Sequence, residues 1–244
     1  MNDGYIAILD SGIGGISVLL ELIKLLPNER YLYFGDNHNA PYGNKSLSQL
    51  LRITEKNIDY IKQYKIKALI FACNTLSVTI LDKIKEYAKV PVFGVFPPVE
   101  SAVMNGGNVL LLSTCRTAEK FKNNANFTAL GLRDLAKEIE NNCFSLDEFR
   151  FMNSISAEER KIIYKNPYET VVLGCTHYFF IKNKIFDHLK PQKILGGENF
   201  TAKKVFDFIK SQKTLVKNKG FEVFFVGKNQ EKNKKFFEKV VKLY

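Results

Sequence analysis

The chain alternates short apolar runs with amphipathic stretches, and this alternation constrains its fold more than any other feature. Strands are expected in the runs YIAIL at 5–9, YLYFGD at 31–36 and KALIFAC at 67–73. Helices are expected between them, at 16–26, from about Ser46 to Tyr64 and from about Leu76 to Tyr87. Strands that alternate with helices through short connections are typical of a parallel sheet covered on both faces.

The alternation breaks at Pro97-Pro98 and then begins again. The second half predicts strands in NVLLLSTCRT, ETVVLGCTH and KILGGEN, and helices from Ala118, in LRDLAKEIENN and in IKNKIFDHL. The last forty residues predict a helix, a strand FEVFFVG and a terminal helix. We therefore expect an α/β protein of two similar lobes, each with a mainly parallel sheet flanked by helices. Residues 1–96 with about 205–244 form the first lobe, residues 97–204 form the second, and the active site lies in the cleft between them.

The formal net charge of +11 comes mostly from lysine, and the chain has few arginines. Proteins that read bases favour the bidentate fork of arginine, so we expect solvated lysine faces and no specific nucleic-acid surface. The N-terminus runs directly into the first expected strand, and no apolar run is long enough to cross a bilayer. The expectation is a cytoplasmic protein without a membrane partner.

Two of the four cysteines occupy matched positions. ALIFACNTLSVTILDKI and TVVLGCTHYFFIKNKI each place a cysteine, Cys73 or Cys175, after an apolar strand and before a helix. The N-terminus of a helix favours a thiolate, so we expect a lowered pKa at both cysteines. Cys115 and Cys143 lack the full pattern and are interpreted as structural. The wide spacing argues against a zinc ribbon, a thioredoxin-like redox pair and a disulfide framework.

Small polar residues follow the other expected strands. In parallel sheets, ligands bind beyond the carboxyl ends of strands. These ends supply Asp10-Ser11, Asp36, Cys73-Asn74-Thr75, Ser113-Thr114-Cys115 and Cys175-Thr176-His177. His177 is a candidate acid–base partner of Cys175, and Asp10 could orient Cys73 or take its proton. We expect His38 in an exposed loop and His188 on a helix face.

Three chemistries fit these residues. Cys73, Cys175 and His177 could ligate zinc, although they include no closely spaced pair. Cys175 with His177 could act as a single nucleophile, which leaves Cys73 idle. Two thiols on opposite sides of one substrate use both cysteines: one removes a proton from carbon and the other returns it on the far face.

A rival hypothesis is a dinucleotide-binding module, because Gly12-Ile13-Gly14 follows a strand and Asp36 ends the next one. Two features oppose it: Ser17 stands at the third glycine position, and Asp10 would face a pyrophosphate with like charge.

Four motifs in order, DSGIGG, NAPYGNKS, ACNT and LGCTHY, resemble those of the glutamate racemases in the aspartate/glutamate racemase superfamily. The resemblance covers essentially the whole chain, and PYG with GCTHY points to the glutamate branch over the aspartate and hydantoin branches. It implies interconversion of L- and D-glutamate, supplying D-glutamate for peptidoglycan, without a cofactor or a metal. It also implies a homodimer, because members of the family commonly dimerise.

The resemblance also implies roles for individual residues. Cys73 would act on the D-enantiomer with help from Asp10, and Cys175 on the L-enantiomer with help from His177. The residues implied to hold the substrate are Asp10, Ser11, Tyr42, Gly43, Asn74, Thr75, Thr114, Thr117, Thr176 and His177.

The sequence departs from the family at two places. Phe96-Pro97-Pro98 stands where Glu-Pro-Gly is usual, and TALGLRDLAKEIENN lacks the family's Cys-Pro element. The resemblance implies that Glu140, in that stretch, corresponds to the glutamate that positions the family's histidine, which makes it a further candidate for the catalytic group. These departures leave open an aspartate racemase and a weakened or noncatalytic member.

Overall fold

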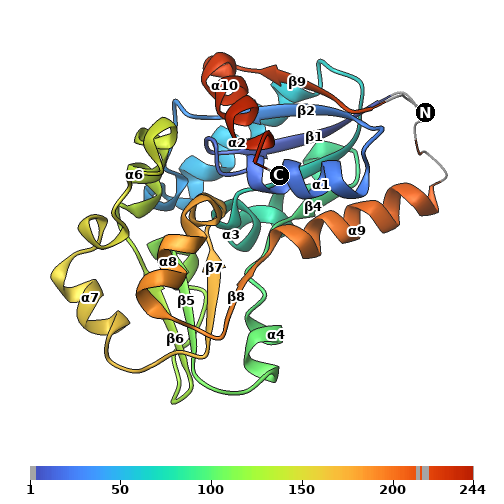
Figure 1. The fold of residues 1–244 in the computed structure, drawn as a ribbon. Coiled ribbons are helices and arrows are strands. Elements are labelled where there is room, and N and C mark those ends of the chain that lie inside the picture. The colour runs from blue at the N-terminus through green and yellow to red at the C-terminus, as the bar shows by residue number, and fades with distance from the viewer. Residues whose placement is uncertain (1–3, 213–214, 216–219, 244) are drawn as a thin grey trace.

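Two parallel sheets form two lobes in the computed structural model, which describes residues 4–212, 215 and 220–243 (Figure 1). The first sheet has five strands in the order β4-β3-β1-β2-β9. They are β4 (Val92–Gly94), β3 (Ile66–Phe71), β1 (Tyr5–Asp10), β2 (Arg30–Gly35) and β9 (Glu222–Val226). The second sheet has four strands in the order β6-β5-β7-β8. They are β6 (Phe127–Gly131), β5 (Val109–Ser113), β7 (Thr170–Gly174) and β8 (Lys193–Gly196).

Helices cover both faces of the first sheet, as the apolar runs predict. Side chains of alternate strand positions pack on one face against α1 (Ile16–Leu25), α9 (Glu198–Ser211) and α10 (Gln230–Val241). The other face packs against α2 (Leu47–Ile61) and α3 (Asn74–Ile84). The expected fold class is confirmed here, and β9 pairs with β2, so the C-terminal segment returns to the first sheet.

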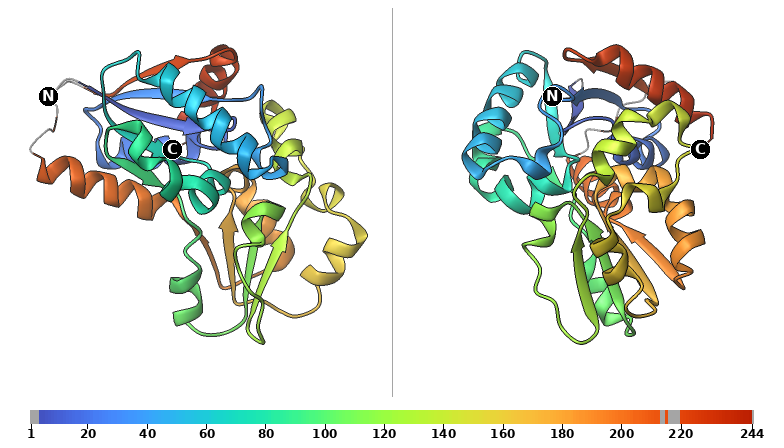
Figure 2. Two further views of the ribbon diagram at one scale, coloured as in Figure 1. Left: turned by 180° about the vertical axis from the view of Figure 1, so that it is seen from behind. Right: turned by 90° about the vertical axis from the view of Figure 1, so that its left-hand side faces the viewer.

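The second sheet is also covered on both faces. One face packs against α6 (Leu135–Asn141), α7 (Ala157–Ile163) and α8 (Lys182–Leu189), and the other against α4 (Val99–Met104). Strands β5 and β7 are buried along their whole length because they are central and have helices on both sides. Figure 2 shows the two lobes from behind and from the side, with α10 of the first lobe next to α6 of the second.

One sequence prediction about this lobe is wrong. The helix expected from Ala118 does not form: α5 (Cys115–Ala118) ends there, and the chain turns into β6, a strand that was not predicted. Asparagine side chains bond this turn, since Asn123 accepts from the Ala129 N–H at 2.7 Å and Asn124 from the Asn126 N–H at 3.0 Å. Such local bonds compete with helical ones.

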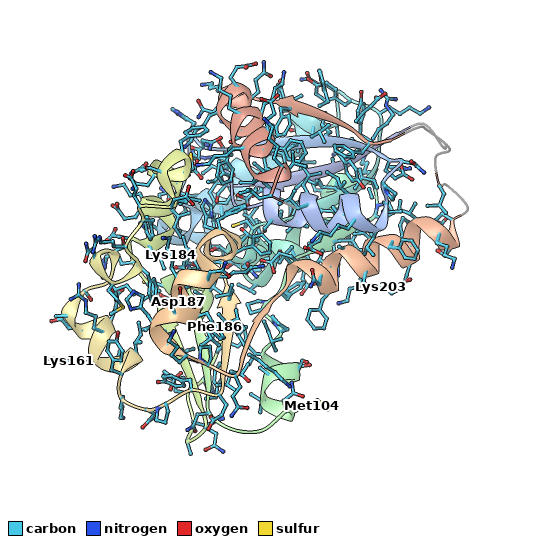
Figure 3. The ribbon with its side chains drawn as sticks, viewed as in Figure 1. Met104, Lys161, Lys184, Phe186, Asp187 and Lys203 are labelled. Carbon is cyan, nitrogen blue, oxygen red and sulfur yellow. The ribbon has the colours of Figure 1, made fainter. Side chains whose placement is uncertain are left out.

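Lysines on the outer helices point away from the body of the protein, as the composition predicts. Lys161 on α7 and Lys203 on α9 are exposed (Figure 3), and Lys203 forms an ion pair with Asp207 at 2.9 Å. Within the described ranges, no helix is long and apolar enough to span a membrane.

The terminal helix is part of the core of the first lobe, which a substitution can test. Phe236 on α10 is fully buried and meets the Phe180 ring edge-on at 4.9 Å. We expect Phe236→Ala to lower the free energy of unfolding by about 3–5 kcal/mol, because a large cavity replaces the ring. Chemical denaturation measures the change. Phe200→Ala, at a ring that is 48% exposed, is the control and should cost about 1 kcal/mol or less. Equal losses would contradict the packing.

Candidate active site

A cavity of about 240 Å³ lies where the carboxyl ends of the strands of both lobes meet. Short loops after β1, β2, β3, β5 and β7 supply most of its wall, as expected for parallel sheets. Eleven residues implied by the sequence line it: Ser11, Tyr42, Gly43, Cys73, Asn74, Thr75, Thr114, Glu140, Cys175, Thr176 and His177. Asp10 and Thr117 are fully buried just behind this lining.

Both candidate thiols face this cavity, one from each lobe. Cys73 caps the N-terminus of α3, and Cys175 caps a 3-10 helix at Thr176–Ile181, with α8 beginning only at Lys182. Each cysteine is 7% exposed. The structure therefore brings together two thiols that are 102 residues apart, at equivalent turns of two different sheets.

The lowered pKa expected for Cys73 is wrong. Burial raises the pKa of the Cys73 thiol, and the negative charge of Asp10 raises it further. The backbone N–H groups at Thr75 and Leu76 lower this pKa, as the helix N-terminus predicts, but they do not outweigh burial. Cys73 is therefore a protonated thiol at neutral pH.

Asp10 is placed to interact with both lobes. Its carboxylate accepts the Gly12 N–H at 2.8 Å and the hydroxyl of Thr176, from the second lobe, at 3.4 Å. Burial raises the pKa of Asp10, while the positive charge of His177 and the Gly12 N–H act in the opposite direction. A buried carboxylate with a raised pKa is a better proton acceptor than an exposed one.

His177 links Cys175 to Glu140. Its Nδ1 lies 3.9 Å from the Cys175 Sγ, and its Nε2 lies 2.8 Å from Oε2 of Glu140. Burial alone would lower the pKa of His177, but the hydrogen bonds and charges of Cys175 and Glu140 outweigh it and raise the pKa well above its usual value. His177 is thus an imidazolium between a thiol and a carboxylate, an arrangement that stabilises a Cys175 thiolate.

The carboxylate of Glu140, which lies on α6, reaches the glycine-rich loop that follows β1. Its Oε2 accepts the Ile13 N–H at 2.9 Å, and a Cβ atom at Gly12 would lie only 2.2 Å from that oxygen. A Cβ atom at Gly14 would lie 2.5 Å from the His177 Nδ1. Glycine is needed at both positions because these side chains approach the backbone so closely. The loop receives the protein's own carboxylate, which opposes the dinucleotide hypothesis.

Burial raises the pKa of Glu140, but the hydrogen bond and charge of His177 and the charge of Lys232 lower it to about 2. Glu140 is therefore ionised throughout the neutral range, and a buried carboxylate paired in this way holds the ring of His177 in place. Glu140 thus makes the contact with the histidine that the resemblance implies.

Asp36, the second residue on which the dinucleotide hypothesis rests, is hydrogen-bonded to side chains of the protein itself. Its Oδ2 accepts from the Tyr42 hydroxyl at 2.7 Å and from Nδ2 of Asn57 at 2.9 Å, and Asn39 also donates to the carboxylate. These bonds fix the loop that carries Tyr42 and Gly43 at the cavity wall.

Threonine hydroxyls connect the lobes beneath the cavity. The Oγ1 of Thr75 lies 3.0 Å from that of Thr114, which donates to Thr117 at 3.1 Å. Thr117 therefore supports the wall rather than forming it. The Nδ2 of Asn74 donates to the Val95 carbonyl at 3.2 Å, and its buried Oδ1 has no hydrogen-bond partner within the described part of the chain. That oxygen is an acceptor available to a ligand.

The sequence reasoning missed several residues of the cavity wall, and two of them contact Glu140. Asn37, directly after Asp36, donates to Oε1 of Glu140 at 2.6 Å, and Lys232 on α10 donates to the same oxygen at 2.6 Å. The strand-end rule could have found Asn37. Nothing in the sequence distinguishes Lys232 from the other lysines of the C-terminal segment.

The remaining histidines and cysteines lie away from the cavity. His38 is in an exposed turn and His188 on the exposed face of α8, as expected. Cys143 is buried in a hydrophobic cluster, and Cys115 lies against Gly131. Across residues 4–212, 215 and 220–243, no three His, Cys, Asp or Glu side chains form a group that could hold a metal, so the zinc alternative has no ligand set there.

Two thiols, one near a buried carboxylate and the other near an imidazolium, thus line one cavity between two α/β lobes. The family model for Asp/Glu/hydantoin racemases matches residues 17–198. The chain is 36% identical over 203 residues to the glutamate racemase of Clostridium novyi, covering 78% of this chain and 75% of that protein. It is 33% identical over 209 residues to that of Clostridium acetobutylicum, covering 81% and 80%. The chain belongs to the Asp/Glu/hydantoin racemase family.

Solved structures agree with this family. The glutamate racemase of Francisella tularensis, in complex with D-glutamate, has a TM-score of 0.79 at 25% identity, over 98% of this chain and 95% of that one. The glutamate racemase of Thermus thermophilus, in complex with β-chloro-D-alanine, has a TM-score of 0.72 at 28% identity, over 98% and 93%.

The contact between Glu140 and His177 makes a prediction about ionisation. Glu140→Gln removes the negative charge and the charged acceptor that raise the pKa of His177, so this pKa should fall. The folded-state pKa of His177 is raised, so the wild-type ring stays protonated to higher pH than the variant ring. Titration of the ring nitrogens by ¹⁵N NMR measures the difference, with the exposed rings of His38 and His188 as internal controls. Identical titration of His177 in both proteins would contradict the contact.

Proposed function

We propose that this protein is a cofactor-independent glutamate racemase in which two thiols transfer the α-proton. The observation that carries the proposal is that Cys73 and Cys175, from equivalent turns of two lobes, line one cavity. Membership of the racemase family and the glutamate racemases among its relatives support the substrate. The cavity of about 240 Å³ suits a small amino acid.

The first half of the reaction starts with Cys73. Asp10, whose pKa burial raises, takes the thiol proton, and the thiolate removes the α-proton of D-glutamate. The pair of electrons stays on the α-carbon as a carbanion. Cys73 is then a thiol again, and Asp10 holds one proton.

The second half takes place on the opposite face of the α-carbon. The thiol of Cys175 donates its proton and forms L-glutamate, and the remaining thiolate is stabilised by the imidazolium of His177. The reverse reaction uses the same groups with exchanged roles: the Cys175 thiolate deprotonates L-glutamate, and Cys73 protonates the carbanion. Each thiol therefore acts as base in one direction and acid in the other.

Groups around the thiols would hold the substrate. We assign the free Oδ1 of Asn74 to the substrate ammonium, because it is a buried acceptor at the cavity. Hydroxyl and N–H donors would hold the two carboxylates. They come from Ser11, the loop at Tyr42 and Gly43, Thr75, Thr114 and Thr176.

The two departures from the family pattern, at 96–98 and at the missing Cys-Pro element, leave these proposed catalytic and substrate-binding residues unchanged. Among the described residues that line the cavity, none comes from 96–98. Glu140 takes the position beside His177 although the Cys-Pro element is missing. These observations favour an active enzyme over a noncatalytic family member, and they leave the cavity itself as the determinant of substrate size.

Other features of the proposed enzyme follow from the resemblance. We propose that the D-glutamate serves peptidoglycan synthesis, that the enzyme works in the cytoplasm, and that it forms a homodimer. We also propose that residues 1–96 with about 205–244 make up the first lobe and residues 97–204 the second.

Racemisation without additives tests the function. The purified protein should convert either enantiomer of glutamate to the 1:1 mixture with no added cofactor or metal, as measured by chiral chromatography. Cys73→Ser and Cys175→Ser should each reduce the rate by about 10²-fold to 10⁴-fold, because each removes one acid–base group. Cys115→Ser, outside the cavity, is the control and should retain activity. Normal rates in both cavity variants would refute the two-thiol mechanism.

Aspartate tests the substrate. It is one methylene shorter than glutamate, so kcat/KM should be about 10-fold to 200-fold lower with aspartate. The same chromatographic assay measures both amino acids. Faster turnover of aspartate would contradict the glutamate assignment while leaving the racemase mechanism intact.

A further inference from the structure

Glu140 belongs to the second lobe by its helix, but most of its contacts are with the first. Helix α6 packs into the core of the second lobe through Leu135 and Ile139. The carboxylate reaches Ile13 after β1, Asn37 after β2 and Lys232 on α10. The group that orients His177 is therefore held across the lobe boundary.

Lys232 adds a second positive charge to this arrangement, after that of His177. Its Nζ donates to Oε1 of Glu140 at 2.6 Å and to the Glu140 backbone carbonyl at 3.0 Å. Two bonds to one residue fix both the backbone and the side chain of Glu140. The Lys232 side chain is 33% exposed and lines the cavity, whereas Lys234 and Lys235 on the same helix are exposed.

From this geometry we propose that Lys232 is a positioning residue of the racemase reaction, which fixes Glu140 across the lobe boundary and thereby holds His177 against Cys175. The inference rests on the proposed function and adds a residue from the last helix of the described chain. Lys232 acts through Glu140 and has no acid–base role of its own.

Helix α10 is anchored firmly enough to serve this purpose. Phe236 is fully buried, and Nδ2 of Asn233 donates to Oδ1 of Asn37 at 3.0 Å. Asn37 donates in turn to Glu140. The helix therefore reaches Glu140 by two routes, directly through Lys232 and indirectly through Asn233 and Asn37, and a shift of α10 would move both.

The charges around His177 explain why a cation is needed. Asp10 and Glu140 are two buried carboxylates near one imidazolium, and Lys232 supplies the second positive charge. Without Lys232, Oε1 of Glu140 loses its charged donor, and the pKa of Glu140 rises because a cause of its lowering is gone. Glu140 would then become protonated at a higher pH, and its support of His177 would be lost sooner as the pH falls.

Loss of Lys232 should impair one half of the reaction. The equilibrium constant between enantiomers is one, so kcat/KM must fall equally in both directions. The balance between the two proton transfers can still change. Cys175 removes the α-proton when the reaction starts from L-glutamate, so a slower Cys175 step makes this removal more rate-limiting. From D-glutamate, Cys175 returns the proton to the carbanion, so the return becomes more rate-limiting and the removal by Cys73 less so.

The test uses Lys232→Met, with Lys235→Met on the exposed face of α10 as the matched control. We expect Lys232→Met to lower kcat/KM by about tenfold to a hundredfold, the value of a charge-assisted hydrogen bond, and to move the acid limb of its pH profile upward. With α-deuterated substrates, the isotope effect on kcat/KM should rise from L-glutamate and fall from D-glutamate. Lys232→Arg keeps the charge and should restore part of each change. Lys235→Met should behave as wild type.

The proposal would be overturned if Lys232→Met left both the pH profile and the isotope effects unchanged. It would also be overturned if the variant lost activity but the isotope effect on kcat/KM changed equally from L-glutamate and from D-glutamate. Thermal unfolding compared with Lys235→Met separates these results from a damaged fold. If the wild-type protein does not racemise glutamate, the proposed function fails separately. In that case ¹⁵N NMR still tests whether Lys232 fixes Glu140 against His177. The Nε2 proton of His177 should exchange with solvent faster in Lys232→Met than in Lys235→Met, and equal exchange rates would overturn the proposal.

Discussion

The approach of the Glu140 carboxylate to the backbone after β1 is the contact on which the site depends. It requires glycine at Gly12, because any Cβ atom there would overlap the carboxylate oxygen. It joins the lobes, because Glu140 comes from α6 while the Ile13 N–H comes from the first sheet. It also orients His177, whose Nε2 shares the same oxygen. The glycine-rich loop after β1, whose composition is typical of phosphate-binding loops, thus binds the carboxylate of Glu140 from the same chain.

The buried charges follow from that contact. A carboxylate removed from water needs charged or hydrogen-bonding partners, and Glu140 receives four, from Ile13, Asn37, His177 and Lys232. The arrangement gives the two thiols different partners: Cys73 has a carboxylate near it, and Cys175 has an imidazolium. The site is therefore asymmetric although the two lobes place their cysteines in equivalent turns, as suits a reaction that moves one proton off and another on.

Much of the fold and of the cavity could be predicted, because strand and helix periodicity and the strand-end rule are local signals. Cys73 and Cys175 were identifiable from matched turns in sequence, and the family motifs added Tyr42 and Glu140. Strand β6 was missed because asparagine contacts set the turn before it. The pKa of Cys73 was predicted in the wrong direction, because burial and the nearness of Asp10 are properties of the folded chain. Lys232 reaches the site only through tertiary packing.

The order of deuterium uptake in wild-type protein tests the central claim, that two thiols act on opposite faces of one carbon. L- or D-glutamate with ordinary hydrogen at its α-carbon is incubated in deuterium oxide. Before one tenth has reacted, the two enantiomers are separated and the mass of each is determined by mass spectrometry. With two bases, the product carries solvent deuterium at its α-carbon while the remaining substrate keeps its hydrogen, in both directions. Product that retains the substrate's own hydrogen would show a single base that returns the same proton, and would contradict the roles assigned to Cys73 and Cys175.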